Sequence, residues 1–469
     1  MKTVIWWIRR DLRVNDNPAL KAAVQNADFV IPVFIRDARL MRLNAPNRIA
    51  FLEAGLRDID ARIQELGGKL IIRNGNPDQV LDRLIQETGA EVIYAEEDYS
   101  PYARKRDDLV ASRLPLRFMV GLTVHNPRAV VKMDGSPYTV FTPFSKAWKA
   151  LPSPGIEQSE EGFRINTPSD IPSEPLPQAL ESKYFPAGEA EARRRLDWFL
   201  EHKVAQYQDG RNFLNEEGTS SLSPYFRFGM LSAKTAVRAV RAKIQALPAG
   251  MQKGAETWLN ELIWREFYQS ILYHFPQVRD EAFNPAYHNI AWRDAPADLA
   301  AWKNGLTGYP IVDASMRQLL EMGWMHNRGR MIVASFLVKD LLVNWQEGER
   351  WFMRHLIDGD LAANNGGWQW TAGVGTDAAP YFRIFNPVLQ AKKFDPCGEF
   401  VRHWVPELRN VNDLYIHEPW LMNAAEQSMS GCRIGVDYPA PIVDHSEARQ
   451  RTLAAFQAAK LFWQEDHAE

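Results

Sequence analysis

Several features that mark common protein classes are scarce or absent in this chain of 469 residues. Only two cysteines occur, Cys397 and Cys432, which excludes a disulfide-stapled scaffold and favours a reducing, cytoplasmic setting. The ten histidines are scattered, and neither C-x2-C nor H-E-x-x-H spacing occurs, so no metal site is expected. The apolar run Val4–Ile8 is too short for a signal segment or a membrane span, and it predicts a buried strand.

Charge of one sign is not in excess either, since 55 basic and 58 acidic residues leave a net charge of −3. This excludes an overall basic nucleic-acid binder but leaves a local basic patch open, because binding depends on where the charges lie. The chain is too long for one ordinary core, so about two or three domains are expected. Tryptophan is plentiful, and thirteen of the sixteen lie at or after Trp198, which indicates stacking surfaces or an electron path besides core packing.

The first part of the chain alternates between short apolar runs and amphipathic segments. Strands are expected at Thr3–Ile8, Phe29–Ile35, Lys69–Arg73 and Glu91–Ala95, and helices at Pro18–Asn26, Arg48–Leu66, Pro77–Glu87 and Pro101–Leu114. This alternation predicts a parallel sheet with helices on both faces. Neither G-x-G-x-x-G nor G-x-x-x-x-G-K-[ST] follows a strand, so a Rossmann-like shape is expected without a dinucleotide bound in the usual way.

The second part of the chain is predicted to be mainly α-helical. It follows a connecting segment, Leu151–Pro186, that is rich in Pro, Ser and Glu. Apolar spacing of i, i+3, i+4 predicts helices at Glu189–Glu201, Ser232–Ala246, Ala255–Tyr273, Ile311–Glu321, Arg328–Asn344 and Glu347–Ile357. The expected domains are therefore an α/β domain (1–130), a linker (131–188) and an all-α domain (189–469).

The densest group of chemically active side chains is Asp358–Trp370, which holds two carboxylates, three carboxamides, three glycines and two tryptophans. Its Asn-Asn-Gly-Gly run contains poor helix formers, so a regular helix is not favoured there. On a helix, Trp368 and Trp370 would point to different sides. From composition, both an irregular helix junction with core tryptophans and a ring-binding site remain open.

Glu261, Trp264, Arg265 and Tyr268 lie at helical offsets of 3, 4 and 7 and share one predicted helix face. A carboxylate, an indole, a guanidinium and a phenol on one face suit the wall of a polar, aromatic pocket. The alternative is a solvated face with an ion pair between Glu261 and Arg265.

Three further stretches each have a functional and a plain interpretation. Trp324–Met331 places two arginines at the head of a predicted helix, which suits either an anion or ordinary capping. The hydroxyl-rich run at 218–223 suits a phosphate cradle or a cap. In Tyr381–Phe394, basic residues alternate with aromatics, as in a nucleic-acid contact or a solvated surface.

Taken together, the motifs resemble the photolyase/cryptochrome family over nearly the whole chain, and within it the class I DNA photolyases that act on cyclobutane pyrimidine dimers. The matching motifs are Arg9–Arg13, Tyr138–Phe144, Gly218–Ser223, Trp258–Tyr268, Thr307–Ala314, Gly323–Arg328 and Asp358–Trp370. The resemblance implies an α/β antenna domain and a helical domain that binds FAD. It also implies light-dependent repair, in which excited reduced FAD donates an electron to a dimer flipped out of UV-damaged DNA.

The resemblance assigns residues to the flavin by matching position. The expected FAD contacts are Tyr207, Thr219, Ser220, Ser221, Leu222, Ser223, Trp258, Glu261, Arg265, Asn327, Arg330, Asp358, Gly359, Asp360 and Asn364. Arg330 and Asp358 are expected to pair near the flavin ring. Asn364 is expected to face flavin N5, because a neutral amide can accept from N5–H without repelling an anionic reduced ring. Trp368, Trp345 and Trp292 match the family's electron-transfer chain from the flavin outward, and three core tryptophans are the alternative.

The resemblance also implies the substrate contacts, with Glu261 and Asn364 expected to act in catalysis. Dimer contacts are expected from Glu261, Trp264, Arg265, Asn327, Met331 and Trp370, and DNA phosphate contacts from Arg211, Arg328, Arg383, Lys392 and Lys393. Trp264 and Trp370 would replace the stacking that an extruded base loses, and Met331 would add a soft packing surface. The protein is expected to act as a monomer, without a membrane.

The antenna cofactor is expected to be 8-hydroxydeazaflavin, with 5,10-methenyltetrahydrofolate second and an empty site third. Folate-type relatives carry Asn-Glu where this chain has Tyr102-Ala103, and the stretch Asp98–Arg106 is more similar to deazaflavin-binding members. The resemblance makes Arg48, Asp98 and Arg106 the antenna contacts.

Two other functions within the family are the alternatives. A (6-4) photolyase has histidines where this chain has Asn327 and Met331. A cryptochrome-type blue-light photoreceptor tends to have an acid or a cysteine in place of Asn364, and single-strand-preferring DASH cryptochromes usually lack tryptophan at Trp370. A plain flavin-binding module would leave Trp264 and Trp370 unexplained.

Overall fold

The computed structural model describes residues 1–42, 44–152, 155, 163–176, 178 and 182–467. The chain forms two compact units. Unit 1 comprises Met1–Gln208, Thr219–Pro276 and Ile357–Ala362, and unit 2 comprises Asp209–Gly218, Gln277–Leu356 and Ala363–Glu469. This division differs from the expected boundary after residue 188, since 219–276 group with the N-terminal sheet. Part of the expected connecting segment Leu151–Pro186 lies outside the described residues.

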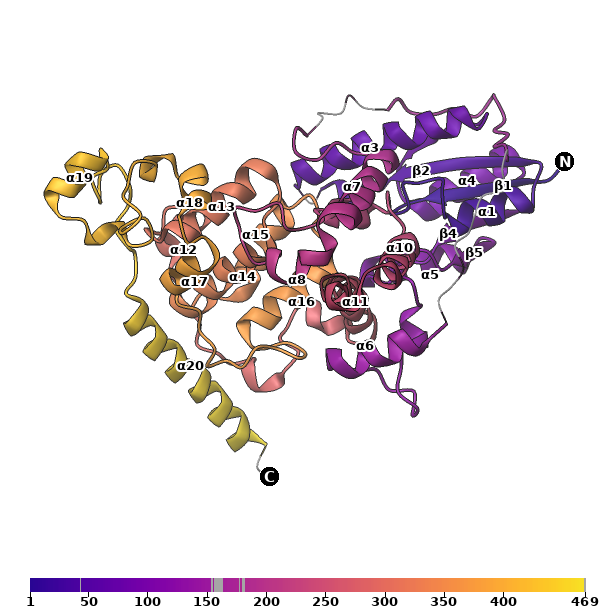
Figure 1. The fold of residues 1–469 in the computed structure, drawn as a ribbon. Helices are drawn as coiled ribbons and strands as arrows, with labels where there is room; N and C mark the ends of the chain where they lie inside the picture. Colours follow the sequence, from indigo (N-terminus) through magenta and orange to yellow (C-terminus); the bar gives the residue numbers. More distant parts are fainter. Residues whose placement is uncertain (43, 153–154, 156–162, 177, 179–181, 468–469) are drawn as a thin grey trace. The chain divides into compact units, whose positions relative to one another are not determined.

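Unit 1 begins with a five-stranded parallel sheet, drawn in indigo in Figure 1. Its strands are β1 (Thr3–Ile8), β2 (Phe29–Arg36), β3 (Ile71–Asn74), β4 (Val92–Glu96) and β5 (Leu116–Met119), in the order β3-β2-β1-β4-β5. The connecting helices include α1 (Pro18–Gln25), α3 (Pro46–Glu65), α4 (Pro77–Thr88) and α5 (Pro101–Ala111). The α/β prediction is confirmed. The strand order reverses at β1, so the carboxyl ends of β1 and β4 flank a topological switch point, where open α/β sheets bind ligands.

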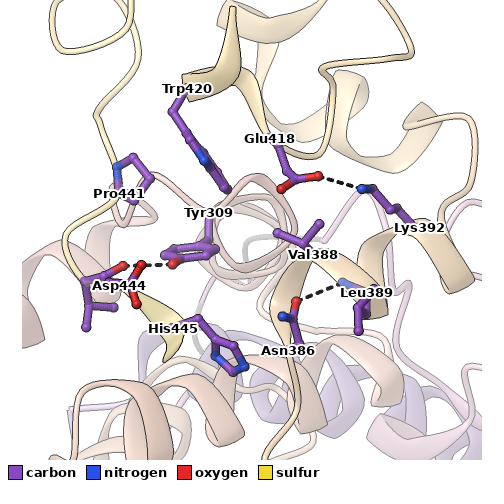
Figure 2. Close-up of a pocket in the computed structure, with 11 residues that line it drawn as sticks. Tyr309, Asn386, Val388, Leu389, Lys392, Glu418, Trp420, Pro441, Asp444 and His445 are labelled. Atoms are coloured by element: carbon purple, nitrogen blue, oxygen red, sulfur yellow. Dashed lines mark hydrogen bonds and ion pairs between the residues drawn. The ribbon is translucent and has the colours of Figure 1, made fainter. Parts of the chain in front are cut away.

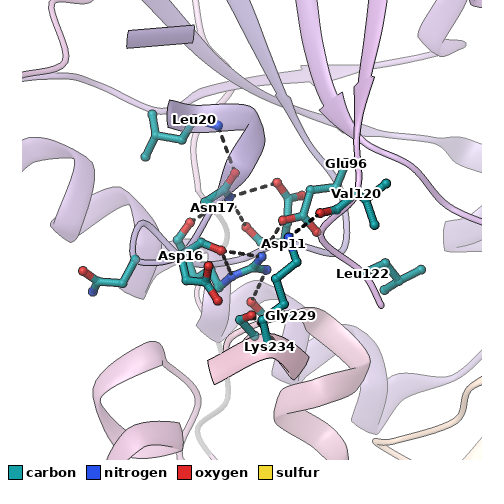
Figure 3. A network of polar contacts seen from close by, with 12 residues as sticks. Asp11, Asp16, Asn17, Leu20, Glu96, Val120, Leu122, Gly229 and Lys234 are labelled. Carbon is teal, nitrogen blue, oxygen red and sulfur yellow. Dashed lines mark hydrogen bonds and ion pairs between the residues drawn. The ribbon is translucent and has the colours of Figure 1, made fainter. Parts of the chain in front are cut away.

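Helices complete unit 1. They are α6 (Phe141–Ala150), α7 (Glu189–His202), α9 (Ser223–Phe228), α10 (Ala233–Ala246) and α11 (Gln252–His274). A buried polar network joins the carboxyl edge of the sheet to α10 and its flanks (Figure 3). Arg13 donates to a Glu96 carboxylate oxygen at 2.5 Å and to the Gly229 carbonyl at 3.1 Å, and Lys234 donates to the Val120 carbonyl at 2.9 Å.

Unit 2 is helical around an apolar core that contains Trp302, Phe336, Trp345, Phe352 and Trp368. Its helices are α12 (Pro296–Asn304), α13 (Pro310–Met322), α14 (Asn327–Ser335), α15 (Trp345–His355), α17 (Pro387–Phe394), α18 (Glu399–Trp404), α19 (Ala424–Ser430) and α20 (His445–Asp466). The short helix α8 (Tyr207–Gly210) and α16 (Leu361–Ala372) each begin in unit 1 and end in unit 2.

The single helix expected over Arg328–Asn344 is wrong. Helix α14 ends at Ser335 and continues as a π-helical turn, η6 (Phe336–Asp340), and Leu342 then adopts a left-handed φ of 51°. A π-helical turn inserts one residue without interrupting the apolar run, so the periodicity of the sequence does not reveal it.

The expectation that Asn-Asn-Gly-Gly would disfavour a regular helix is also wrong, because the run lies inside α16. Long-range hydrogen bonds support the helix here. Asn365 and Gln369 both donate to the Val278 carbonyl, at 3.0 and 2.9 Å, and Gln369 accepts from the Phe283 amide at 2.8 Å. Tertiary contacts therefore outweigh local propensity.

Within the described part of the chain, no helix is both long and apolar enough to cross a membrane. The same residues contain no cluster of three or more His, Cys, Asp or Glu side chains arranged to hold a metal ion.

Candidate active site

Some of the expected site residues lie in unit 1 and others lie in unit 2. In unit 1, Arg10 follows β1 and contacts two carboxylates. Its guanidinium is 3.7 Å from Asp98, which follows β4, and 2.5 Å from Asp360, which precedes α16. Burial favours the neutral form of Asp98, but Arg10 and Arg106 hold its pKa below the ordinary value. Asp360 also accepts from Gln269 and from the Ala362 amide, at 3.1 and 3.0 Å, so its carboxylate is fixed.

Despite its burial, Arg10 has a pKa above the ordinary value because Asp360 and Asp98 stabilise its charge, whereas the other three arginines near Asp360 are not compensated in this way. Burial lowers the pKa of Arg48 and Arg265, and it lowers that of Arg227 to about 9, with Arg10 adding repulsion. Asp358 and Asp360 act on Arg48 in the opposite direction. An arginine whose pKa falls would gain from an added negative charge. This part of unit 1 is therefore suited to an anionic group such as a diphosphate or an anionic ring.

A corner of aromatic and hydroxyl groups forms from three of the expected flavin contacts. The Trp258 indole donates to the Ser220 hydroxyl at 3.3 Å, and Trp258 and Tyr207 both pack on Phe199, with ring centroids 5.1 and 5.6 Å apart. The residue at the N-cap of α9 is Leu222, which makes no side-chain capping hydrogen bond, so the capping interpretation of the hydroxyl-rich run gains no support from this residue. Ser221 adopts a left-handed φ of 50°, which is uncommon outside glycine and typical of functional loops.

In unit 2, Asn364 on α16 has its amide orientation set by Glu349 on α15. The Asn364 Nδ2 donates to the backbone carbonyl of Glu349 at 3.1 Å and to its carboxylate at 3.0 Å. Burial raises the pKa of Glu349. With both amide hydrogens directed to Glu349, the Asn364 Oδ1 is the group left to accept a hydrogen bond from a ligand N–H.

The two tryptophans of α16 differ in burial, as their two-residue offset predicts. Trp368 is 2% exposed, whereas Trp370 is half-buried. Trp368 packs edge-on against Phe352 and Trp302, at 5.0 and 6.1 Å between centroids. A Cβ added at Gly348 would overlap the Trp368 ring, so only glycine leaves room for it.

The other two tryptophans of the expected electron chain also lie in unit 2. Trp345 is buried in the core, and Trp292 is half-buried and packs against the same core. Burial thus decreases from Trp368 and Trp345 to Trp292. This gradient is compatible with an electron path that ends at the surface and with the core-tryptophan alternative. Trp302 and Phe352, the aromatic neighbours of Trp368, were not expected from the sequence.

On α11, the predicted shared face exists, and Trp264 has a partner that the sequence did not indicate. Its ring stacks on Phe141 with 3.7 Å between centroids and an angle of 4°. Trp264 remains half-buried, so stacking occupies one of its faces. Arg265 donates to the Leu122 carbonyl at 3.0 Å, and burial lowers its pKa, so it is not an ordinary solvated surface charge.

The start of α14 gathers several expected DNA contacts in unit 2. Arg328 donates to the side-chain Oδ1 of Asn212 at 2.5 Å and lies over the Phe394 ring at 4.2 Å. Its pKa is lowered first by burial and then by the charges of Arg211 and Arg383. Three arginines from distant stretches therefore come together and are suited to an anion.

The side chains next to these arginines are already engaged within unit 2. Met331 Sδ lies 4.0 Å from the side-chain Nδ2 of Asn327, and the Arg330 Nε donates to the Met325 carbonyl at 2.9 Å. The capping interpretation is confirmed for His326, whose Nδ1 accepts from the Arg328 amide at 3.1 Å.

The two lysines of the predicted basic segment have neighbours of their own. Lys392 pairs with Glu418 at 2.5 Å, and Lys393 lies over the Phe394 ring at 5.3 Å. Lys392 also borders a cavity of about 530 Å³ whose lining includes Tyr309, Trp420 and His445 (Figure 2). Another lining residue, His445, is hydrogen-bonded through its Nδ1 to Asp340 at 2.5 Å.

Two family models together match most of the chain. Residues 4–161 match the family model described as DNA photolyase, and residues 258–458 match the one described as the FAD binding domain of DNA photolyase. A curated relative from Synechococcus sp., named deoxyribodipyrimidine photo-lyase, is 39% identical over 99% of each chain.

Two solved structures are similar over almost their full length. A bacterial class III photolyase from Agrobacterium tumefaciens is 37% identical, with a TM-score of 0.93 and 98% of each chain covered. A cryptochrome from Synechocystis sp. is 29% identical, with a TM-score of 0.87, and the match covers 97% of this chain and 99% of that one.

Proposed function

The chain belongs to the DNA photolyase family and is a flavin-dependent photo-lyase, and we propose that its substrate is the cyclobutane pyrimidine dimer in UV-damaged DNA. The observation that carries the substrate assignment is the state of His326. Burial lowers its pKa to about 4, and its Nδ1 is engaged in capping α14. A neutral, engaged histidine is not a general acid. Asn327 and Met331, rather than histidines, stand beside it, which favours dimer repair over (6-4) repair.

The residues present fit FAD. The buried arginines near Asp360 suit its negative charge, the corner of Tyr207, Ser220 and Trp258 suits a polyol chain, and the Asn364 oxygen suits flavin N5–H. The residues that would hold FAD are the individual contacts that the resemblance assigns, of which Tyr207 is the first in the sequence and Asn364 is the last. When bound, FAD would supply the light-driven electron donation that dimer repair requires.

The side chains of the protein would bind and position the dimer and exclude water. Trp264 and Trp370, both half-buried, would stack on the extruded bases. Glu261 and Asn327 would hydrogen-bond base edges. Arg211, Arg328 and Arg383 would neutralise phosphates, which makes binding weaken as salt rises.

For the antenna, we propose 8-hydroxydeazaflavin at the switch point between β1 and β4. Arg9 and Arg106 lie over the Trp7 ring, at 4.6 and 5.0 Å, and Asp98 is held ionised nearby. Asp98 and Arg106, together with Arg48, would contact the antenna. The absorption spectrum of protein purified from its native host tests this, since a deazaflavin and a folate absorb at different wavelengths.

Class I membership stays a prediction, because a solved relative at 37% identity is titled a class III photolyase. A cryptochrome-type photoreceptor is the second candidate, favoured by the likeness to the Synechocystis protein. The test is to reduce the purified protein, add dimer-containing DNA and illuminate with near-UV or blue light. Recovery of thymine absorbance supports repair. If a flavin-loaded protein restores none, dimer repair is wrong and the photoreceptor function is favoured.

A further inference from the structure

Lys339 is a buried lysine of unit 2 to which the proposed function gives no role. It is 1% exposed and lies in the π-helical turn η6. Its Nζ donates to the Ala372 carbonyl, at the end of α16, at 2.7 Å and lies 3.7 Å from the centre of the Phe456 ring on α20. Turns of this kind are frequent at functional sites.

Within the described residues, no carboxylate is within ion-pair distance of Lys339. Asp340, its neighbour in the chain, is directed instead to His445 of α20 at 2.5 Å. Arg451 of α20 donates to the Asp340 carbonyl at 2.6 Å, and Arg293 donates to the Leu341 carbonyl at 2.9 Å. The ammonium is therefore held by one carbonyl and one aromatic ring.

Burial alone lowers the pKa of Lys339 to about 7, so its charge changes near neutral pH. Helices α14 and α15 also pack against η6, but none of their charged groups shifts this pKa. The other titratable groups close by are Tyr287 and Tyr381, which pack against Phe456. Burial raises the pKa of Tyr287, so it stays neutral in this pH range.

Lys339 lies close to the three segments that carry Trp292, Trp345 and Trp368, the tryptophans of the proposed electron chain. Phe456, under its ammonium, packs edge-on against Trp292 with 6.0 Å between centroids. The turn η6 packs against α15, whose first residue is Trp345. The carbonyl that Lys339 binds ends α16, which carries Trp368.

We propose that Lys339 is a positioning residue whose charge controls how well Trp292 holds the positive charge left when it donates an electron. The inference rests on the proposed electron chain. In photoreduction, Trp292 would lose one electron, which would pass through Trp345 and Trp368 to the bound, photoexcited cofactor. The indole N–H proton leaves to solvent, and an external thiol then returns one electron and one proton to Trp292.

A charged Lys339 disfavours oxidised Trp292, because two nearby positive charges repel each other in a poorly polarisable interior. A neutral Lys339 removes this repulsion. The yield of flavin photoreduction in the presence of a thiol is therefore expected to rise about fivefold as pH increases through about 7. The lifetime of the tryptophan radical should rise with it.

The test follows both quantities by transient absorption between pH 6 and 9, on the full flavin-loaded chain. Lys339→Met should give the high yield at every pH, and Lys339→Arg the low yield at every pH. A purely structural role would lower both yields together and would not separate the two variants. A flat wild-type profile, or an unchanged step in Lys339→Met, would overturn the proposal.

Two further variants change the surroundings of Lys339 without replacing the lysine. Phe456→Leu removes the ring under the ammonium and should move the step to lower pH, so an unmoved step contradicts the proposal even if Lys339→Met does not fold. Burial raises the pKa of Asp340 to about 6, so Asp340→Asn serves as a control and should leave the step near pH 7. A step that vanishes in Asp340→Asn would transfer the effect to Asp340 and refute the inference.

Repair by chemically reduced protein separates this inference from the proposed function. That assay bypasses photoreduction, so Lys339→Met and Lys339→Arg should repair dimers as the wild type does. Loss of repair in the wild type contradicts the proposed function and leaves the pH step as an independent readout. If tryptophan radicals are absent at every pH, the electron chain and the inference fail together.

Discussion

Arg10 and Asp360, 350 positions apart in the sequence, form an ion pair with 2.5 Å between Nη2 and Oδ2. Arg10 follows the first strand and also lies 3.7 Å from Asp98. Asp98 was assigned to the antenna and Asp360 to the flavin. One side chain therefore contacts a residue of each proposed site, and the two sites share an electrostatic link within unit 1.

The first prediction follows from this link. Arg10→Leu removes the cation that contacts both carboxylates and should cost about 3–5 kcal/mol, as breaking a buried ion pair usually does. Flavin content per chain should fall, measured by absorbance after purification. Arg62→Ala is the matched control, because Arg62 pairs with Glu65 on an exposed helix surface. Full flavin content and unchanged unfolding in Arg10→Leu would show that the pair is dispensable.

A second prediction concerns the amide that Glu349 orients. Asn364→Asp places a carboxylate where a neutral oxygen is expected to face flavin N5, so the reduced, anionic ring should become less stable. The flavin potential should fall, and repair should slow about tenfold, which corresponds to about 1.4 kcal/mol. A redox titration measures the potential. Asn304→Asp, on the exposed side of α12, adds the same charge elsewhere and should change neither quantity.

The strands β1 to β4 could be predicted because a strand buried between two helical layers is a continuous apolar run. The edge strand β5 could not, since Arg117 and Phe118 are exposed and its run of four residues carries no such signal. The difference in burial between Trp368 and Trp370 follows from their two-residue spacing once the segment is a helix, which local propensity did not favour. The roles of individual residues came from the resemblance of the motifs to the family, because hydrophobic periodicity predicts secondary structure but not function.

Long-range partners are the part that the sequence did not reveal. Nothing local indicates that Phe141 stacks on Trp264 or that Glu349 holds Asn364, because each pair joins separate segments. In the sequence, Lys339 stands beside Asp340 in a mainly apolar stretch. Its meaning depends on the π-helical turn and on the ring of Phe456 beneath it.

The third prediction tests the substrate wall. Trp370→Ala should weaken binding of dimer-containing DNA by about 1–3 kcal/mol, the usual contribution of a stacked aromatic side chain. Flavin content should stay unchanged, because Trp370 is half-buried while Trp368 fills the core. Fluorescence titration with damaged and undamaged DNA measures both affinities. Trp463→Ala, on α20, is the control. Equal affinity for damaged DNA in wild type and Trp370→Ala would remove Trp370 from the substrate pocket.

The last prediction concerns His326, which is 3% exposed and caps α14 through its unprotonated Nδ1. Burial, aided by Arg328 and Arg330, lowers its pKa from 6.5 in the unfolded chain to about 4. A lowered pKa means that the folded state binds the proton more weakly than the unfolded state. The stabilisation is therefore complete above pH 6.5 and is lost as pH falls toward 4, by about 3 kcal/mol in total.

The matched variant is His326→Asn, because asparagine also caps helices but does not titrate. Thermal unfolding between pH 4 and 8 should show a shallower acid decline in His326→Asn than in the wild type. His202→Asn removes a histidine that is exposed and should leave the decline unchanged. If His326→Asn and the wild type lose stability in parallel below pH 6.5, the cap does not titrate, and the acid sensitivity arises elsewhere in the protein.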